Sequence, residues 1–356
     1  MLVITLLLMG GATFLIGLVP TFEQVGSLAP ALLVVLRFLQ GFAVGGEWGG
    51  ATLMVVEHAA EKNRNFYASW PQTGASVGSI LSTSVFAVFS SLPDVYFFSW
   101  GWRVPFLLSI VLIAVGFFIR LRVLESPVFS RIKELGFESK APLIEVLRDH
   151  PVAAVLAAGA TLIVINGFYI VTTFTLAYGT GQLGVSRSVL LAGVVLGGVA
   201  QVAGNLIFAR VADRLGKRPV AIWSAACVFL LSYPFFWLVD TGLAVLICLA
   251  MSAWLFACGA LYGILGVFIA ELFPAQVRYS GISFSYQVAA ILGGSLAPIV
   301  AVALASSAGG ASWPVATYLA ANAFISLVSV YLASERYRVS IHDPRPAECL
   351  LASNCG

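Results

Sequence analysis

Charged residues are scarce in this chain of 356 residues: Lys, Arg, Asp and Glu together make up 10% of it, against about 25% in an ordinary soluble domain. Hydrophobic residues make up 60%, and the mean hydropathy is +0.98. A soluble fold of this size could not remove so much apolar surface from water. The composition therefore excludes a soluble protein and predicts an integral membrane protein whose solvent is lipid.

Histidine and cysteine are also few. The five cysteines form no disulfide framework, and the three histidines, His58, His150 and His342, lie at or beyond the ends of apolar runs. No H-E-x-x-H motif, zinc-type spacing or basic tract occurs in the sequence. We therefore expect that the protein is not an enzyme, holds no metal or other cofactor, and binds no nucleic acid.

Ten apolar segments are long enough to cross a hydrocarbon core of about 30 Å as α-helices. They span residues 1–20, 28–56, 67–91, 102–122, 151–178, 187–209, 219–239, 242–270, 281–305 and 312–333. The first has no positively charged start and no cleavage site, so we interpret it as a span and not as a signal peptide. The predicted fold class is an all-α integral membrane protein.

Lys and Arg collect on one side of these segments. Sixteen of the nineteen lie in the loops 57–66, 123–150, 210–218 and 271–280, at the span end 120–122, or after residue 333. By the positive-inside rule this side is cytoplasmic, and both termini lie there. The longest polar stretch, 123–150, is then a cytoplasmic linker between a four-span bundle (1–122) and a six-span bundle (151–333), and 334–356 form a cytoplasmic tail.

An internal repeat relates the two bundles at a shift of 214 residues. The shift superposes Pro20 on Pro234, Gly45 on Gly259, Gly49 on Gly263, Glu57 on Glu271, and Arg64 on Arg278. Parallel repeats of six spans build one large class of transporters. The second half begins at Pro151, so the repeat predicts a first half that begins roughly 60–70 residues before Met1, and the ten spans (4 + 6) belong to an expected twelve.

Several motifs resemble those of the major facilitator superfamily. Residues 209–218 read A-R-V-A-D-R-L-G-K-R, similar to the loop signature G-x-x-x-D-R-x-G-[RK]-[RK], with Ala209 in place of the first glycine. Residues 37–41 read R-F-L-Q-G, similar to R-x-x-Q-G, and G-G-E-W-G-G follows at 45–50. With L-E-S-P at 124–127 and E-L-F-P at 271–274, the chain resembles the metabolite:proton symporter branch almost throughout, up to about Arg336.

That branch carries α-ketoglutarate, citrate, shikimate, or proline and betaine. The resemblance implies a major-facilitator-type bundle that moves a small organic acid or zwitterion across the cell membrane by alternating access, with protons, as a monomer in the lipid bilayer. The antiporter run G-P-x-x-G-G is absent, and W-P-Q-T-G stands at 70–74 instead, which favours symport or uniport. The alternatives are a channel, which the two-half repeat disfavours, and an inactive fragment of a transporter that lacks two spans.

Two charged residues fall inside a span, Arg37 and Glu47. An ionised side chain there costs at least about 2.5–3.5 kcal/mol, and the two are about 15 Å apart along a helix, too far to pair. Glu47 is a candidate proton-coupling group, because a carboxyl in a low dielectric exchanges protons near neutral pH. Arg37 is a candidate for binding an anionic group or for steering a proton, and the two residues are together the candidates for proton coupling or gating. The alternatives are a structural hydrogen bond for Glu47 and a snorkelling side chain for Arg37.

Other candidate residues fall into two sets. Polar and aromatic groups within spans could line a substrate cavity, or could instead bond neighbouring helices: Gln40, Gln72, Asn166, Tyr169, Gln201, Tyr262, Tyr286 and Gln287. The resemblance implies a charge latch on the cytoplasmic side, whose members could instead serve only topology: Asp213, Arg214, Gly216, Arg218, Glu271 and Arg278. Glycines four apart predict close helix packing: Gly41, Gly45 and Gly49, and likewise Gly74 with Gly78, Gly193 with Gly197, and Gly259 with Gly263.

Overall fold

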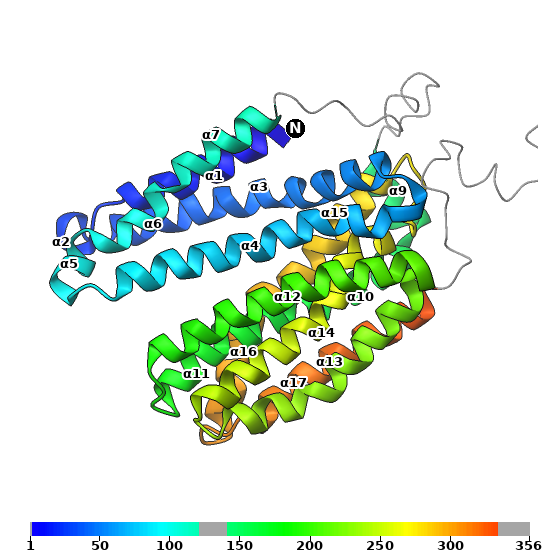
Figure 1. Cartoon of the computed structure of the whole chain (residues 1–356). Helices are drawn as coiled ribbons and strands as arrows, with labels where there is room; N and C mark the ends of the chain where they lie inside the picture. Colours follow the sequence, from blue (N-terminus) through cyan, green and yellow to red (C-terminus); the bar gives the residue numbers. More distant parts are fainter. Residues whose placement is uncertain (1, 121–140, 334–356) are drawn as a thin grey trace, which may run out of the picture. The chain divides into compact units, whose positions relative to one another are not determined.

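The computed structural model describes residues 2–120 and 141–333, and every regular element in this part of the chain is a helix (Figure 1). A helix satisfies its backbone donors and acceptors internally, which lipid cannot do for them. Within the described part, nine helical segments are long and apolar enough to cross a membrane, and α1 (Leu2–Leu18) is apolar but has 17 residues. Each of the ten predicted spans is therefore helical.

The other nine spans are built from the following elements, in chain order. They are α3 (Leu28–His58), α4 (Arg64–Ser90), α6 (Val104–Leu107), α7 (Ser109–Arg120), α10 (Pro151–Tyr169), the π-helix η3 (Ile170–Phe174), α11 (Thr175–Gly181), α12 (Arg187–Leu215), α13 (Lys217–Val239), α14 (Ala244–Ala270), α15 (Arg278–Ala289), the π-helix η4 (Ala290–Ser295), α16 (Ala297–Ser307) and α17 (Trp313–Leu332). Short helices are α2 (Phe22–Val25), η1 (Glu61–Asn63), α5 (Asp94–Ser99), η2 (Gly101–Arg103) and α9 (Pro142–Asp149).

Several helices are longer than their apolar cores. The expectation of a loop over 210–218 is wrong, because α12 continues to Leu215 and α13 begins at Lys217. Only Gly216 separates the two helices, and its φ of +88° is one that a side chain would disfavour. Hydropathy marks the part of a helix that lies in hydrocarbon, whereas the helix itself runs on into the polar interface. Asp213 and Arg214 therefore lie in the last turn of α12.

The described chain forms two compact units, and their boundaries differ from the expected ones. The first unit holds the residues up to Ala51 and those from Leu81 to the end of α7; the second holds Thr52–Ile80 and α9 to α17. The segment 52–80 joins the second unit because its side chains contact α12, α14 and α15, as described below. Of the expected linker, only α9 and the residues beside it are described; 123–140 and the tail after 333 lie outside the described residues.

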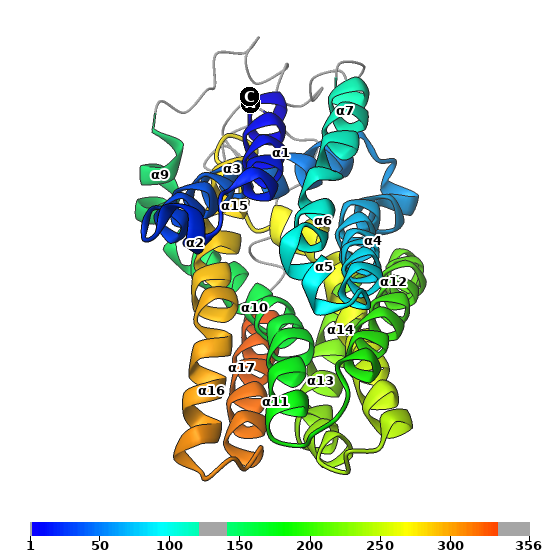
Figure 2. The same ribbon diagram turned by 90° about the vertical axis from the view of Figure 1, so that its left-hand side faces the viewer.

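In the first unit, α1 packs along α6 and α7 (Figures 1 and 2). Arg103, at the start of the α6–α7 segment, donates hydrogen bonds from Nη1 to the carbonyl oxygens of Gly17 (2.9 Å) and Val19 (2.8 Å). These carbonyls belong to the end of α1, where a helix leaves acceptors without intrahelical donors. The arginine thus holds the two helix ends together.

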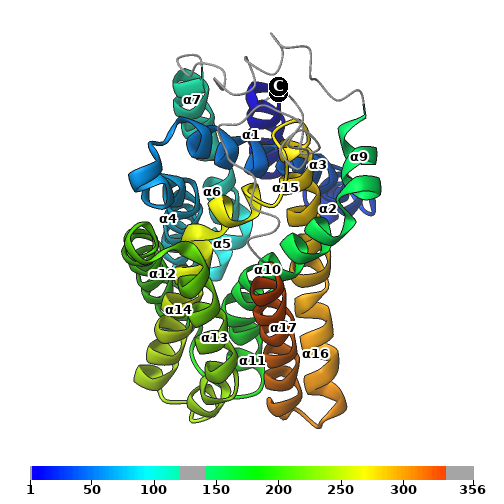
Figure 3. The same ribbon diagram turned by 90° about the vertical axis from the view of Figure 1, so that its right-hand side faces the viewer.

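In the second unit, α12 lies along α14, and α13 lies between α14 and α17 (Figures 1 and 3). A Cβ atom added to Gly263 would lie 2.6 Å from the Asn205 carbonyl oxygen, and one added to Gly259 would lie 2.7 Å from that of Gln201. The predicted close packing is therefore confirmed for α12 and α14. It is wrong for Gly41 and Gly45 of α3 and for Gly74 and Gly78 of α4, where a Cβ atom would meet no described atom within 4 Å.

The helix boundaries follow the 214-residue repeat. Arg64 is the first residue of α4 and Arg278 is the first residue of α15, and 64 + 214 = 278. Likewise α3 begins at Leu28, and α14 begins at Ala244, two residues from the expected 242. The 214-residue repeat therefore relates helix starts as well as single residues. Repeat-related residues accordingly have equivalent positions on their helices.

Candidate functional site

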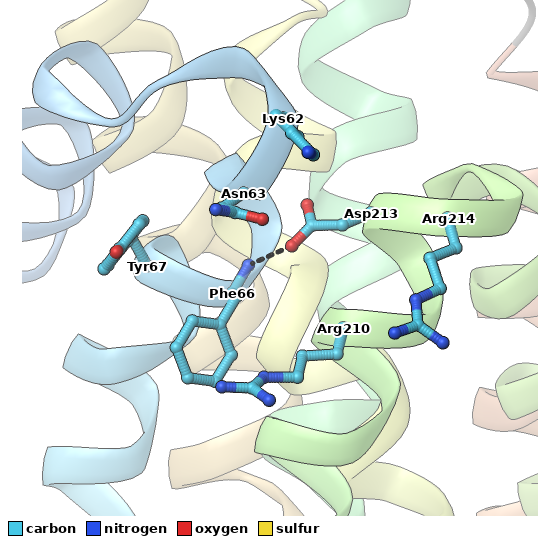
Figure 4. A pocket seen from close by; sticks show the side chains of 7 residues that line it. All are labelled: Lys62, Asn63, Phe66, Tyr67, Arg210, Asp213 and Arg214. Atoms are coloured by element: carbon cyan, nitrogen blue, oxygen red, sulfur yellow. Dashed lines mark hydrogen bonds between the residues drawn. The ribbon is translucent and has the colours of Figure 1, made fainter.

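The carboxylate of Asp213 caps the N-terminus of α4 (Figure 4). Asp213 Oδ1 accepts hydrogen bonds from the backbone N–H and the side-chain amide of Asn65, both at 2.9 Å, and Oδ2 accepts one from the backbone N–H of Phe66 at 3.1 Å. The first N–H groups of a helix have no partner within it, and its dipole favours an anion there. An aspartate of α12 thus supplies the cap that the sequence before α4 does not.

A pocket of about 390 Å³ surrounds this cap. Its lining residues come from η1, from the start of α4 and from the C-terminal part of α12, and they are Lys62, Asn63, Phe66, Tyr67, Arg210, Asp213 and Arg214. The guanidinium of Arg210 lies 4.2 Å from the ring centroid of Phe66, a cation–π contact (Figure 4). Arg214 is exposed and points away from Asp213. One cation–π contact therefore lies in the pocket beside the Asp213 carboxylate.

A buried ion pair lies beside the cap in the same unit. Arg278 Nη1 is 3.4 Å from Glu57 Oε1, and the two side chains are 0% and 4% exposed. The Nε–H of Arg278 also donates to the carbonyl oxygens of Ala270 (3.1 Å) and Phe273 (3.2 Å). The guanidinium is therefore bonded at two of its nitrogens, and it joins the end of α3 to the start of α15.

The repeat-related charges gather at this point. Glu57 and Glu271 are repeat mates, as are Arg64 and Arg278, and both Glu271 and Arg64 lie close enough to act electrostatically on Arg278. Glu271 itself pairs with Lys217, the first residue of α13. Each half of the repeat thus contributes one acid and one arginine to a single cluster.

The other latch candidates lie elsewhere. Arg218 donates from Nη2 to the Tyr331 carbonyl oxygen at 3.1 Å, so it holds α13 to α17. Gly216 forms the break between α12 and α13. Of the six candidates, Asp213, Glu271 and Arg278 therefore form the polar contacts of the cap and the charge cluster. Arg214 lines the pocket around the cap, Gly216 forms the helix break, and Arg218 bonds α17.

Two of the cavity candidates share a buried polar cluster. Gln72 of α4 is 0% exposed and Gln201 of α12 is 2% exposed. Ser76 connects them, because its hydroxyl lies 3.2 Å from Gln201 Oε1 and 3.3 Å from the Gln72 carbonyl oxygen. The side-chain amide of Gln72 has no hydrogen-bond partner among the described residues, and its Nε2 lies near Gly266 of α14. A buried amide of this kind is a group that a polar ligand or water can satisfy.

A second cluster lies around Asn166 of α10. Its Nδ2 donates to the hydroxyl of Tyr318 at 3.1 Å, while its Oδ1 has no partner in the described part of the chain. Tyr286 lies within reach of Tyr262 and close to Tyr169, so that α10, α14 and α15 each contribute one tyrosine. Gln287 is half-buried on α15. The prediction from sequence did not include Tyr318, which is one of two tyrosines in the apolar helix α17 and which no spacing marks.

The remaining candidates lie on α3 in the first unit. Arg37 Nη1 donates to Gln40 Oε1 at 3.3 Å, and Gln40 Nε2 donates to the hydroxyl of Thr13 at 2.5 Å, which links α3 to α1. Glu47 is half-buried. As predicted, Arg37 and Glu47 lie ten residues apart on one helix and do not pair. The structure brings Arg37 together with Gln40.

Comparison with known proteins identifies the class. The family model described as the Major Facilitator Superfamily matches residues 1–298. The inner membrane metabolite transport protein YhjE of Escherichia coli (strain K12) is 37% identical over 351 residues, which cover 96% of this chain and 78% of that protein. The shikimate transporter of the same organism is 37% identical over 343 residues, covering 95% and 78%. The crystal structure of a D-xylose-proton symporter is similar with a TM-score of 0.63 and 16% identity, covering 96% and 82%.

The chain therefore belongs to the Major Facilitator Superfamily. It is a multi-pass membrane transporter and not an enzyme, and its relatives include metabolite transport proteins. The resemblance seen in the sequence motifs is thus confirmed at the level of the family.

Proposed function

We propose that the chain is a secondary active transporter that moves a small organic acid or zwitterion across the cytoplasmic membrane by alternating access, in symport with protons and as a monomer. The observation that carries this proposal is the Asp213 cap. It joins two helices with hydrogen bonds and charge alone, at a helix end where water can replace them. Such a contact can break and re-form in each transport cycle without disrupting an apolar core.

The orientation proposed for the chain follows from its charges. The Asp213 end carries Lys62, Arg64, Arg210, Arg214 and Lys217, so the positive-inside rule makes it cytoplasmic, with both termini on that side. The cap, the Glu57–Arg278 pair and the pocket around Phe66 then form a cytoplasmic latch. When the latch breaks, the cytoplasmic ends of α4 and α12 separate and open the path to the cytoplasm.

The substrate region proposed for the second unit is the set of clusters around Gln72 and Asn166. They offer amides and phenols and no formal charge, which suits hydroxyl, carboxylate or zwitterionic groups that accept and donate hydrogen bonds. Arg37 adds a cation in the first unit that suits a carboxylate. Glu47, half-buried on a span, is the proposed proton-exchanging group.

The change Glu47→Gln is expected to abolish proton-driven accumulation, because glutamine keeps the shape of the side chain but exchanges no proton. The measurement is uptake of radiolabelled shikimate, citrate and betaine into proteoliposomes with and without an inward proton gradient. We expect the intact chain to accumulate at least one of these solutes several-fold with the gradient, and Glu47→Gln only to equilibrate it. Glu61→Gln, an exposed change on η1, is the control and should accumulate as the unchanged chain does.

Two outcomes would count against this proposal. If Glu47→Gln keeps full accumulation, Glu47 is structural and does not couple protons. If the intact chain equilibrates none of the solutes, the alternative stated above, an inactive fragment of such a transporter, gains support over the transporter itself.

A further inference from the structure

Three cationic side chains line the pocket around the Asp213 cap. Lys62 belongs to η1, and Arg210 and Arg214 lie about one turn apart in α12 (Figure 4). Because the lining holds one carboxylate beside these cations, its formal net charge is +2. Among the described residues, Lys62 and Arg214 form no hydrogen bond or ion pair, and the contact of Arg210 is with the Phe66 ring. The pocket therefore offers cations that no described acid neutralises.

The one carboxylate of the lining already has its partners. The Asp213 oxygens accept three hydrogen bonds from the start of α4, two at 2.9 Å and one at 3.1 Å. A helix N-terminus also favours a negative charge through its dipole. The charge of Asp213 is thus stabilised by α4, and the three cations remain available for a second anion. The pocket of about 390 Å³ is within the range of small-molecule sites, about 300–1,000 Å³.

The pocket lies at the level where the polar interface meets the hydrocarbon. The apolar part of α4 begins directly after Phe66, and that of α12 ends directly before Arg210. About one turn further into each span, Trp70 is 52% exposed and Ile207 is 51% exposed. The Trp70 ring meets the Phe66 ring edge-on, with centroids 6.1 Å apart. Tryptophan and tyrosine are enriched at this depth of a membrane. An amphipathic ligand would therefore place its anionic group among the cations and its apolar part against these side chains.

We propose that this pocket binds the phosphate group of an anionic phospholipid of the surrounding bilayer. Arg210 is the main contact, since a guanidinium held over an aromatic ring keeps a planar fork of N–H donors that fits phosphate oxygens. Lys62 and Arg214 add charge from both sides of the pocket. The bound phosphate connects η1, before α4, with the end of α12, beside the hydrogen bonds of Asp213. This site goes beyond the proposed transport function and does not depend on it, because lipid binding requires no transported solute.

Native mass spectrometry of the detergent-purified chain tests this inference by measuring the first lipid molecule bound. The probes are phosphatidylglycerol, phosphatidylcholine and, as a water-soluble phosphate, glycerol 3-phosphate. We expect the unchanged chain to bind phosphatidylglycerol several-fold more tightly than either of the other two probes. Arg210→Gln is expected to weaken phosphatidylglycerol binding about fivefold, as the contribution of one cation at an anionic membrane surface predicts. The double change of Lys62→Gln with Arg214→Gln removes two such cations and is expected to weaken it about 25-fold.

A matched control separates the pocket from the net charge of the protein. The double change of Arg148→Gln with Arg187→Gln also removes two exposed cations, one from α9 and one from the start of α12, and neither residue lines the pocket. This control should bind phosphatidylglycerol as the unchanged chain does. Elution as a monodisperse peak in size-exclusion chromatography shows which variants are folded.

Three results would overturn the inference. The first is equal phosphatidylglycerol binding by the Lys62→Gln, Arg214→Gln variant and by the control. The second is equal binding of phosphatidylglycerol and phosphatidylcholine by the unchanged chain, which would show that the pocket does not distinguish an anionic lipid. The third is binding of glycerol 3-phosphate as tight as that of phosphatidylglycerol, which would make the ligand a soluble phosphate. If Arg210→Gln does not fold, the double variant decides, because Lys62 and Arg214 are exposed and bond no described residue.

Discussion

Replacing Arg278 with methionine is expected to lower the free energy of unfolding by about 3–5 kcal/mol, the cost of removing one partner of a buried ion pair. The Arg278 side chain is 0% exposed, and its loss would remove this guanidinium from the buried Glu57 carboxylate and its Nε–H from the carbonyl oxygens of Ala270 and Phe273. The measurement is thermal unfolding of the detergent-purified chain, followed by size-exclusion chromatography after heating. We expect a melting temperature lowered by several degrees or more, and a reduced yield of monodisperse protein.

Two variants make this prediction specific. The double change of Glu57→Leu with Arg278→Met removes both charges and is expected to recover part of the loss, since a buried pair replaced by apolar groups is often tolerated. Arg148→Met serves as the matched control, because Arg148 is 85% exposed and its pair with Asp149 spans 3.9 Å. An exposed pair of this kind contributes about 0–1 kcal/mol. A melting temperature of Arg278→Met equal to that of Arg148→Met would contradict the structural role of the pair.

Replacing Asp213 with alanine is expected to reduce transport by tenfold or more while the chain still folds. The change removes all three hydrogen bonds to the start of α4 and the favourable charge at its N-terminus. The state in which α4 and α12 are held together then loses stability relative to the open state. One of the two states that alternating access requires is therefore less populated. Uptake into proteoliposomes measures the loss, and the rate at which a thiol at Tyr67→Cys reacts with a charged maleimide measures opening of the pocket around the cap.

The variant Asp213→Asn separates the contribution of the hydrogen bonds of the cap from the contribution of its charge. Asparagine keeps a carbonyl oxygen that accepts a hydrogen bond but carries no charge, so uptake should lie between that of the unchanged chain and that of Asp213→Ala. Exposed Glu61→Gln is again the control. Unchanged uptake and labelling in Asp213→Ala would show that the contact serves topology alone, which is the alternative that the sequence left open.

The helices could be predicted from the sequence because lipid offers no hydrogen bonds to the backbone, so an apolar span must satisfy its own backbone groups. In the described part of the chain each of the ten apolar runs is helical, and the glycines of α12 and α14 marked the places where backbones meet. Helix ends were less predictable, since the residues around Asp213 are polar and yet helical. Charge and hydropathy report where a helix meets water, and they do not report where it stops.

The contacts of the candidate site could not be predicted in the same way. Asp213 binds backbone N–H groups of residues 147 and 148 positions away, and a backbone donor leaves no mark in the sequence. The repeat singled out Glu57 and Arg278 separately, but only the structure pairs them across 221 residues. Asp240 accepts hydrogen bonds from Tyr178 of α11 and from Ser312 before α17, and no motif or spacing links the three residues. Tertiary packing alone brings such groups together.

The measurement that tests the central claim most directly is proton movement driven by solute. The intact chain is reconstituted in proteoliposomes without any imposed gradient, and shikimate, citrate or betaine is added outside while a dye reports the external pH in a weakly buffered medium. The account predicts that at least one solute makes the external medium more alkaline as protons enter with it, that a protonophore abolishes the change, and that Glu47→Gln shows none. Entry of a solute, followed by its radiolabel, with no accompanying change of pH would contradict proton symport.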